Sequence, residues 1–166
     1  VHRGTHVQIH GNHFSRTARI DMLQILQRAC TRIGIRIHYG KRIGDVAALA
    51  SEVDLLIAAD GGNSAVRTQM AEHFRPSFVK RRNKFAWYGT RQRFHPVSLI
   101  FRETEYGVFI AHSYQYSPEL STFLIEVDPD TWKRAGLDQA SEDESRRFCA
   151  EVFRAELRQY DVPARF

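Results

Sequence analysis

The stretch Val53–Arg67, VDLLIAADGGNSAVR, combines an apolar run, a glycine turn and a helix start. The apolar residues are continuous up to Ala59, which predicts a fully buried strand rather than a half-exposed one. Asp60-Gly61-Gly62 predicts a sharp turn that lets the backbone approach another group closely, and Asn63 or Ser64 can cap the helix that follows. Such a junction exposes N–H groups in the crevice where open α/β sheets bind nucleotides. The same pattern also fits an ordinary strand-to-helix turn.

Composition is typical of a globular protein. The chain has 166 residues, of which 43% are hydrophobic and 26% are charged. No run of about 18 apolar residues and no signal-peptide pattern is present, so we expect no membrane span and a cytoplasmic location. The dispersed net charge of +5 fits a solvated surface or an anionic partner. Cys30 and Cys149 are predicted to be buried thiols, and the start at Val1 predicts an internal piece of a longer protein.

The first half of the chain alternates strand and helix signals. Alternation over 1–9 and 35–39 predicts two strands, and apolar spacing over 19–33 predicts an amphipathic helix that Gly34 ends. A brief connection is predicted over 43–50 and a second helix over 64–74. Four histidines near the start invite a metal site, but strand spacing holds residues four apart about 13 Å from each other. We therefore expect no metal site from His2, His6, His10 and His13.

The second half of the chain, from Phe85 onward, is rich in strand signals. We predict three or four antiparallel strands, separated by turn residues, over 85–90, 97–102, 108–116 and 121–127. A capping box at Ser141 and Glu144 predicts the start of a structural helix. The basic cluster over 80–84 lacks the aromatic platform of a nucleic-acid site, so we expect no nucleic-acid partner.

Aromatic residues are dense in the predicted strands, and they are either sheet core or the lining of a site for an aromatic substrate. Two-residue spacing places His112 and Tyr114 on the same face of one strand. We therefore predict that both contact substrate, with a hydrogen-bonded role in the core as the alternative.

The residues of the opening stretch also match a known family. The sequence DLLIAADGGNSAVR from Asp54 to Arg67 meets every fixed position of D-h-h-h-x-A-D-G-x-x-S-x-V-R, where h is apolar. This pattern resembles the internal DG motif of the group A FAD-dependent aromatic monooxygenases. Later features, including W-x-G-T from Trp87 and F-R-E-T-E-x-G from Phe101, resemble the salicylyl-CoA and 2-aminobenzoyl-CoA hydroxylase branch.

The resemblance implies an α/β fold with a mixed α+β organisation. Residues 1–78 would be part of a Rossmann-like FAD-binding domain that contains the DG motif. Residues 79–166 would be a substrate-binding lobe, built as an antiparallel sheet with a packing helix. Two family features are absent from the sequence: a G-x-G-x-x-G after an opening strand and a G-D motif after the substrate lobe. We therefore predict that this chain alone binds FAD weakly or not at all.

The resemblance also implies the cofactors FAD and NAD(P)H, with O2 as co-substrate and an aromatic substrate, either free or as a CoA thioester. The flavin carries the redox chemistry, so no catalytic side chain is expected. Family position makes Asp60, Gly61 and Arg19 candidates for cofactor binding. Arg67, one turn into the helix, could hold the Asp60 carboxylate or a phosphate, or be a surface charge. The alternatives are a non-hydroxylating flavoprotein of the same fold and a catalytically dead ligand-binding module.

Overall fold

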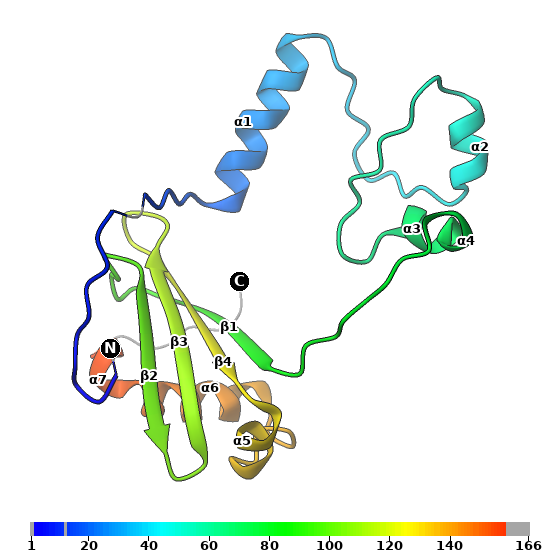
Figure 1. Ribbon diagram of the computed structural model, residues 1–166. Coiled ribbons are helices and arrows are strands. Elements are labelled where there is room, and N and C mark those ends of the chain that lie inside the picture. The colour runs from blue at the N-terminus through cyan, green and yellow to red at the C-terminus, as the bar shows by residue number, and fades with distance from the viewer. Residues whose placement is uncertain (1, 12, 159–166) are drawn as a thin grey trace. The chain divides into compact units, whose positions relative to one another are not determined.

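The computed structural model describes residues 2–11 and 13–158 (Figure 1). The chain divides into two compact units, one made of residues 1–25 with residues 81–166 and the other of residues 26–80. One division point lies after residue 80. The helix α1 (Arg19–Arg32) runs through the other division point, so its first residues belong to one unit and its last to the other.

The first unit is built on a four-stranded antiparallel sheet. Its strands are β1 (Lys84–Thr90), β2 (Ser98–Thr104), β3 (Gly107–Gln115) and β4 (Ser121–Val127). They lie in the order β1-β4-β3-β2, so β2, β3 and β4 form a meander and β1 pairs with the far side of β4. The four strands predicted from alternation and turn residues are confirmed, each within a few residues.

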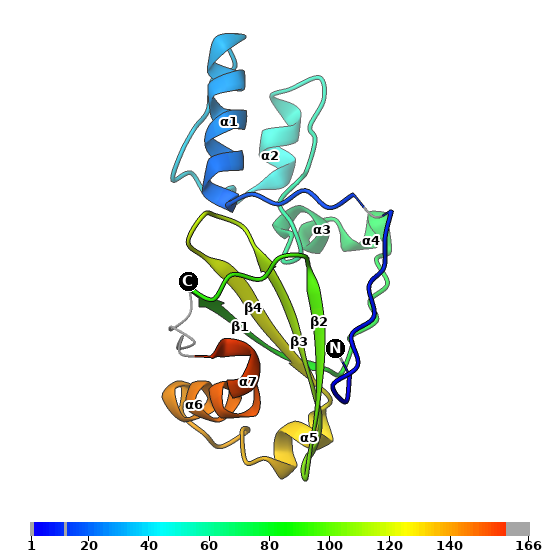
Figure 2. The same cartoon turned by 90° about the vertical axis from the view of Figure 1, so that its left-hand side faces the viewer.

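One face of this sheet is covered by helices (Figure 2). They are α5 (Pro129–Arg134), α6 (Glu142–Val152) and α7 (Arg154–Leu157). Strand alternation turns Phe109, Phe123 and Ile125 toward the helices, where they form one apolar core with the helical residues Cys149 and Phe153. All five are 0% exposed, and each large side chain so buried contributes about 1.5–3 kcal/mol to stability.

The predicted capping box begins α6. The Ser141 hydroxyl accepts a hydrogen bond from the Glu144 N–H at 3.3 Å, and the Glu144 carboxylate accepts one from the Ser141 N–H at 2.8 Å. Two backbone donors at the helix start are thereby satisfied, and the capping prediction is confirmed.

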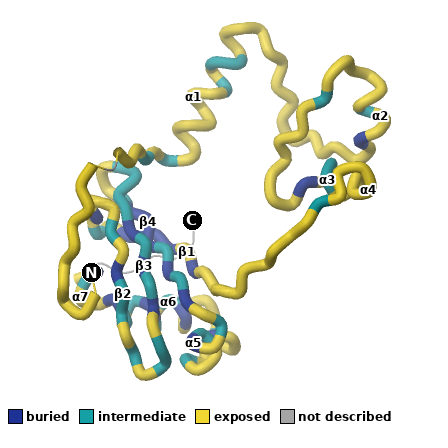
Figure 3. Tube along the Cα trace, viewed as in Figure 1, coloured by how far each residue is buried: buried dark blue, intermediate teal, exposed yellow. Residues whose placement is uncertain are grey.

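Strand positions that alternate with the core residues are mostly half-buried or exposed, and they form the other face of the sheet. In Figure 3 they are the teal and yellow stretches of the strands. One row across the four strands is set by the register: Trp87 on β1, Leu124 on β4, His112 on β3 and Leu99 on β2. Trp87 is 56% exposed and Leu99 is 47% exposed. We call this surface the open sheet face.

The second unit contains the end of α1 with three short helices, α2 (Val46–Ser51), α3 (Ala65–Gln69) and α4 (Ala71–Phe74). The predicted helix over 19–33 is confirmed, and the one over 64–74 is present but interrupted at Met70. Residues 43–50, predicted to be a connection, contain most of α2. The Gln69 side chain joins two helices, because it accepts from the Val46 N–H at 3.1 Å and donates to the Gly44 carbonyl at 2.8 Å.

Three predicted strands in the first half of the chain are wrong. Residues 53–59 form no strand, and Leu55 and Ile57 are 76% and 78% exposed. Residues 35–39 and the described residues of 1–9 are also without a strand; only isolated bridges link His2 to Thr5 and to Phe101. A strand needs a neighbour to satisfy its N–H and C=O groups, and the described residues of 26–80 supply none. The Rossmann-like sheet is therefore not seen here.

The described helices include none that is both long enough and apolar enough to cross a bilayer. Over residues 2–11 and 13–158, no three His, Cys, Asp or Glu side chains gather as a metal ion would require.

Candidate functional site

The DG corner, which we define as residues 60–67, is held by the Asp60 carboxylate. One carboxylate oxygen accepts from the Ser64 hydroxyl at 2.6 Å, and the other accepts from the Ala65 and Val66 N–H groups at 2.7 and 3.2 Å. Ser64 is the N-cap of α3, and its hydroxyl also accepts from the Arg67 N–H at 2.9 Å. Of the two capping candidates in the sequence, Ser64 is the one used. Asp60 and Ser64 together hold the glycine turn against the start of α3.

The hydrogen bonds of the corner hold the pKa of Asp60 below its ordinary value. The Ser64 hydroxyl is the main cause, and the N–H groups of Val66 and Ala65 act in the same direction. All three donate to the ionised carboxylate and therefore favour it over the protonated form. The start of α3 thus already carries an anion of the chain itself.

Arg67 holds the glycine turn. Its guanidinium donates to the carbonyl of Gly61 at 3.4 Å and to the carbonyl of Gly62. The guanidinium carbon also lies 4.9 Å from the centre of the Phe78 ring, a cation–π contact. No hydrogen bond between Arg67 and the Asp60 carboxylate is found in the described part of the chain. Arg67 therefore fixes the carbonyl side of the turn.

The N–H side of the turn is open. Gly61 has φ +81°, a conformation that favours glycine, and a Cβ built on Gly61 or Gly62 would meet nothing within 4 Å. Within residues 2–11 and 13–158 the N–H groups of these two glycines donate to no acceptor. A ligand oxygen could therefore approach the backbone here, beside the helix start that Asp60 occupies.

Arg19 is the first residue of α1 and is exposed. It belongs to the unit that contains the sheet, whereas Asp60, Gly61 and Arg67 belong to residues 26–80. The structure thus brings three of the four predicted cofactor-binding residues together in one corner and describes Arg19 separately from them.

His112 and Tyr114, the predicted substrate-binding residues, both lie on the open sheet face. The Nε2 atom of His112 lies 3.1 Å from a carboxylate oxygen of Glu126 on β4. The other oxygen of that carboxylate accepts from the Asn83 side-chain amide at 2.6 Å. The Tyr114 ring packs edge-on against Phe14, with ring centres 5.7 Å apart.

Glu126 and Asn83 were missed by sequence reasoning. Glu126 is the one acidic residue within the apolar run 121–127, and alternation places it on the face opposite Phe123 and Ile125. That signal was available, but the pairing of Glu126 with His112 depends on the register of β3 against β4, which the sequence does not specify.

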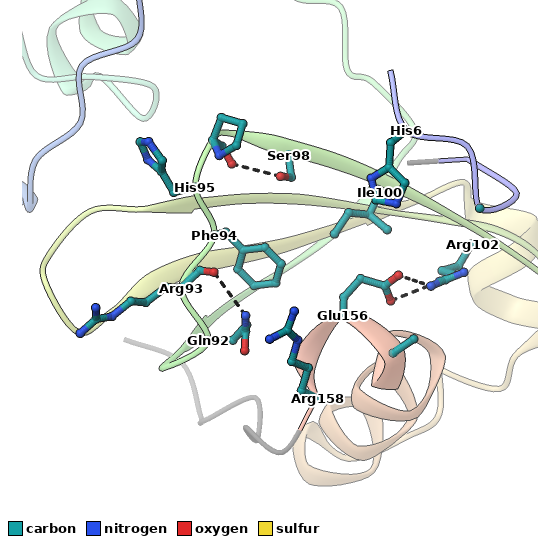
Figure 4. Close-up of a pocket in the computed structure, with 13 residues that line it drawn as sticks. His6, Gln92, Arg93, Phe94, His95, Ser98, Ile100, Arg102, Glu156 and Arg158 are labelled. Atoms are coloured by element: carbon teal, nitrogen blue, oxygen red, sulfur yellow. Dashed lines mark hydrogen bonds and ion pairs between the residues drawn. The ribbon is translucent and has the colours of Figure 1, made fainter. Parts of the chain in front are cut away.

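A cavity of about 500 Å³ lies in the sheet unit, between the start of β2, the preceding loop and α7 (Figure 4). The Arg102 guanidinium, on its wall, forms an ion pair with the Glu156 carboxylate, with Nε 3.2 Å from one oxygen. Phe94 and Ile100 supply apolar surface. None of the site residues predicted from the sequence lines this cavity, so its size alone does not connect it with the predicted chemistry.

Comparison with known proteins adds a second line of evidence. No protein-family model matches the sequence. The chain is 32% identical over 162 residues to a salicyloyl-CoA 5-hydroxylase of a Streptomyces species, covering 93% of this chain and 31% of the relative. It is 36% identical over 140 residues to protodeoxyviolaceinate monooxygenase of Chromobacterium violaceum, covering 84% and 37%.

A third relative is a 3-hydroxy-4-methyl-anthranilyl-[aryl-carrier protein] 5-monooxygenase of Streptosporangium sibiricum, 33% identical over 110 residues, covering 66% of this chain and 30% of the relative. All three relatives are oxygen-inserting oxidoreductases by name. The chain is a homologue of these aromatic hydroxylases, and the family relationship predicted from the DG motif is confirmed. It spans about a third of the length of each relative.

Proposed function

We propose that this chain is part of a monooxygenase that hydroxylates an aromatic substrate, carried as a thioester, with FAD, NAD(P)H and O2. The observation that carries the proposal is the complete DG corner in a homologue of three named hydroxylases. The flavin, when bound, supplies the redox chemistry that activates O2. The protein's own residues bind the substrate, orient it and exclude water from it.

The DG corner fits a phosphate-bearing cofactor at one edge. The open N–H groups of Gly61 and Gly62 are donors of the kind that cradle phosphate oxygens. Asp60 would not contact the phosphate directly, since its carboxylate is already bound to the start of α3 and two anions repel each other. Its role would be to hold the turn, while Arg67 donates hydrogen bonds to the Gly61 and Gly62 carbonyls.

The open sheet face fits an aromatic substrate. Trp87, Leu99 and Leu124 provide apolar surface around His112 in one row across the sheet. Aromatic rings pack favourably on such surfaces through dispersion and offset stacking. Two of the relatives act, by name, on a CoA-linked and a carrier-protein-linked aryl group. A thioester-linked aryl ring is therefore the substrate class we assign.

The test uses the complete gene product that contains this sequence. We expect it to retain a yellow flavin, to oxidise NADH or NADPH faster when salicyloyl-CoA or an anthranilyl thioester is present, and to release a product heavier by one oxygen atom. Flavin and NAD(P)H oxidation without an oxygenated product would instead indicate a non-hydroxylating flavoprotein. Thioester binding without flavin would indicate a ligand-binding module. Either result overturns the proposal.

Matched variants connect the activity with the sites. Asp60→Ala should weaken the use of both cofactors, whereas Asp54→Ala, an exposed carboxylate on the same stretch, should not. His112→Gln should raise the KM for the aromatic thioester, whereas His10→Gln should leave it unchanged. Equal effects of a site variant and its control would remove that site from the proposal.

A further inference from the structure

The surroundings of His112 determine which of its two ring nitrogens carries the hydrogen. His112 lies on β3 between Leu124 of β4 and Leu99 of β2, so strands flank it on both sides. Glu126 is the diagonal neighbour on β4, a distance that long side chains span. Its carboxylate accepts from Asn83 on one oxygen and lies 3.1 Å from His112 Nε2 on the other. The Glu126 side chain is 22% exposed, which limits competition from water.

This contact selects a tautomer of the neutral imidazole. A carboxylate only accepts hydrogen bonds, so the Nε2 atom of His112 must carry the hydrogen. The Nδ1 atom is then an acceptor. Among the described residues no donor reaches Nδ1, while the His112 side chain remains 38% exposed. An unused acceptor therefore lies in the row of the open sheet face that also holds Trp87 and the two leucines.

Within residues 2–11 and 13–158, no titratable side chain of the open sheet face forms a hydrogen bond with Nδ1. On the open sheet face, Tyr114 lies two residues along β3, and Glu126 is the carboxylate already bound to Nε2. Glu103, near the far end of β2, is held by the Arg3 guanidinium at 3.0 Å and by His2 at 3.1 Å. The hydrogen-bond donor to Nδ1 would therefore come from a ligand and not from a cation of the protein.

We propose that Glu126 is a positioning residue, which holds His112 with its hydrogen on Nε2 so that Nδ1 accepts a hydrogen bond from the phenolic O–H of the aromatic substrate. The inference rests on the proposed function for its substrate. The names of two relatives specify aryl groups that carry a ring hydroxyl. Accepting that hydrogen bond places partial negative charge on the phenol oxygen, which enriches the ring carbons ortho and para to it in electrons. In a salicyloyl group the para carbon is C5, the position that the name of the first relative specifies.

The first experiment needs no activity. Long-range ¹H–¹⁵N NMR of this chain, above the pH at which histidine titrates, reports which ring nitrogen is protonated, and the His112→Gln variant assigns the signal. We expect His112 with hydrogen on Nε2 alone. In Glu126→Gln the two tautomers should mix, whereas Glu105→Gln, an exposed carboxylate in the β2–β3 turn, should change nothing. Hydrogen on Nδ1 in the unmodified chain would overturn the inference whatever the protein catalyses.

The second experiment uses the complete gene product with 2-hydroxybenzoyl-CoA and its 2-methoxy analogue. Glu126→Gln should lower kcat/KM for the hydroxy substrate about 3- to 10-fold, the size of one neutral hydrogen bond, and leave the methoxy substrate unchanged. Equal losses for both substrates would indicate a merely structural Glu126 and overturn the inference. Absence of hydroxylation by the unmodified protein would instead overturn the proposed function, with the NMR result unaffected.

Discussion

The turn between β2 and β3 provides a sharp test of packing, because Gly107 has no room for a side chain. A Cβ at this position would lie 2.1 Å from Thr131 Oγ1 and 3.1 Å from an Arg134 guanidinium nitrogen. Neither neighbour can move freely. Thr131 is 1% exposed, and Arg134 donates at 2.8 Å to the Tyr106 carbonyl. Gly107 also has φ +135°, which other residues rarely adopt.

We therefore expect Gly107→Ala to lower the free energy of unfolding by two separate effects. Backbone strain of this kind costs about 1–3 kcal/mol, and forcing a methyl group into a packed site costs roughly another 1–3 kcal/mol. The sum is a large part of the ~5–15 kcal/mol that stabilises an ordinary domain. Gly136→Ala is the matched control, since Gly136 has φ +70° but nothing within 4 Å of its Cβ. It should lose only the strain, about 1–2 kcal/mol.

Urea unfolding followed by tryptophan fluorescence measures both variants, because both tryptophans, Trp87 and Trp132, lie in the sheet unit. A Thr131→Ala background removes the atom that clashes. The cost of Gly107→Ala should then fall by about 1–2 kcal/mol, a coupling that a double-mutant cycle isolates. If Gly107→Ala costs no more than Gly136→Ala, or if the cycle shows no coupling, the steric argument is wrong.

Three further predictions concern single groups. Ser113 is 0% exposed and its hydroxyl has no hydrogen-bond partner among the described residues, so Ser113→Ala should be neutral or stabilising in urea unfolding. Ser121→Ala removes the acceptor of the Phe94 N–H at 3.1 Å and should cost about 1–3 kcal/mol. Equal costs for the two variants would contradict the reasoning. Burial raises the pKa of the Cys149 thiol to about 12, so a thiol reagent should label the half-buried Cys30 in the native protein and reach Cys149 only after unfolding. The pKa of Asp60 is lowered, so its contribution to stability is present above the ordinary carboxyl pKa, near pH 4, and is lost as pH falls through the lower folded value. NMR titration of the Ala65 and Val66 amides should show that low midpoint, and Asp60→Asn should abolish it. A midpoint at or above the ordinary carboxyl pKa would refute the capping geometry.

Sequence reasoning succeeded where the deciding contacts are local. The antiparallel strands are joined by short turns, so alternation and turn residues sufficed to place β2, β3 and β4. The capping box at Ser141 and the corner at Asp60 are likewise built from residues within a few positions of one another. Closeness in the sequence therefore keeps Asp60, Gly61 and Arg67 in one corner, whereas their cofactor-binding role was implied by the family resemblance and stays a prediction.

Sequence reasoning failed where a contact requires a partner from elsewhere in the chain. The apolar run 53–59 has the composition of a buried strand, yet without a neighbouring strand its residues stay exposed. The pairing of His112 with Glu126 depends on strand register, and a shift of one residue would place the two side chains on opposite faces. Composition indicates which secondary structure a segment can form, and the neighbouring strands available to it decide whether that structure forms.

The strand order has a consequence for the path by which the sheet assembles. β1 pairs with β4, the strand that follows it last in the sequence, as in the pair Lys84↔Val127. Closing so large a loop is entropically slower than forming the two hairpins of the β2–β3–β4 meander. We expect the meander to fold first and β1 to dock late, so that Tyr88, the buried aromatic residue of β1, is the last aromatic residue of the sheet to leave water.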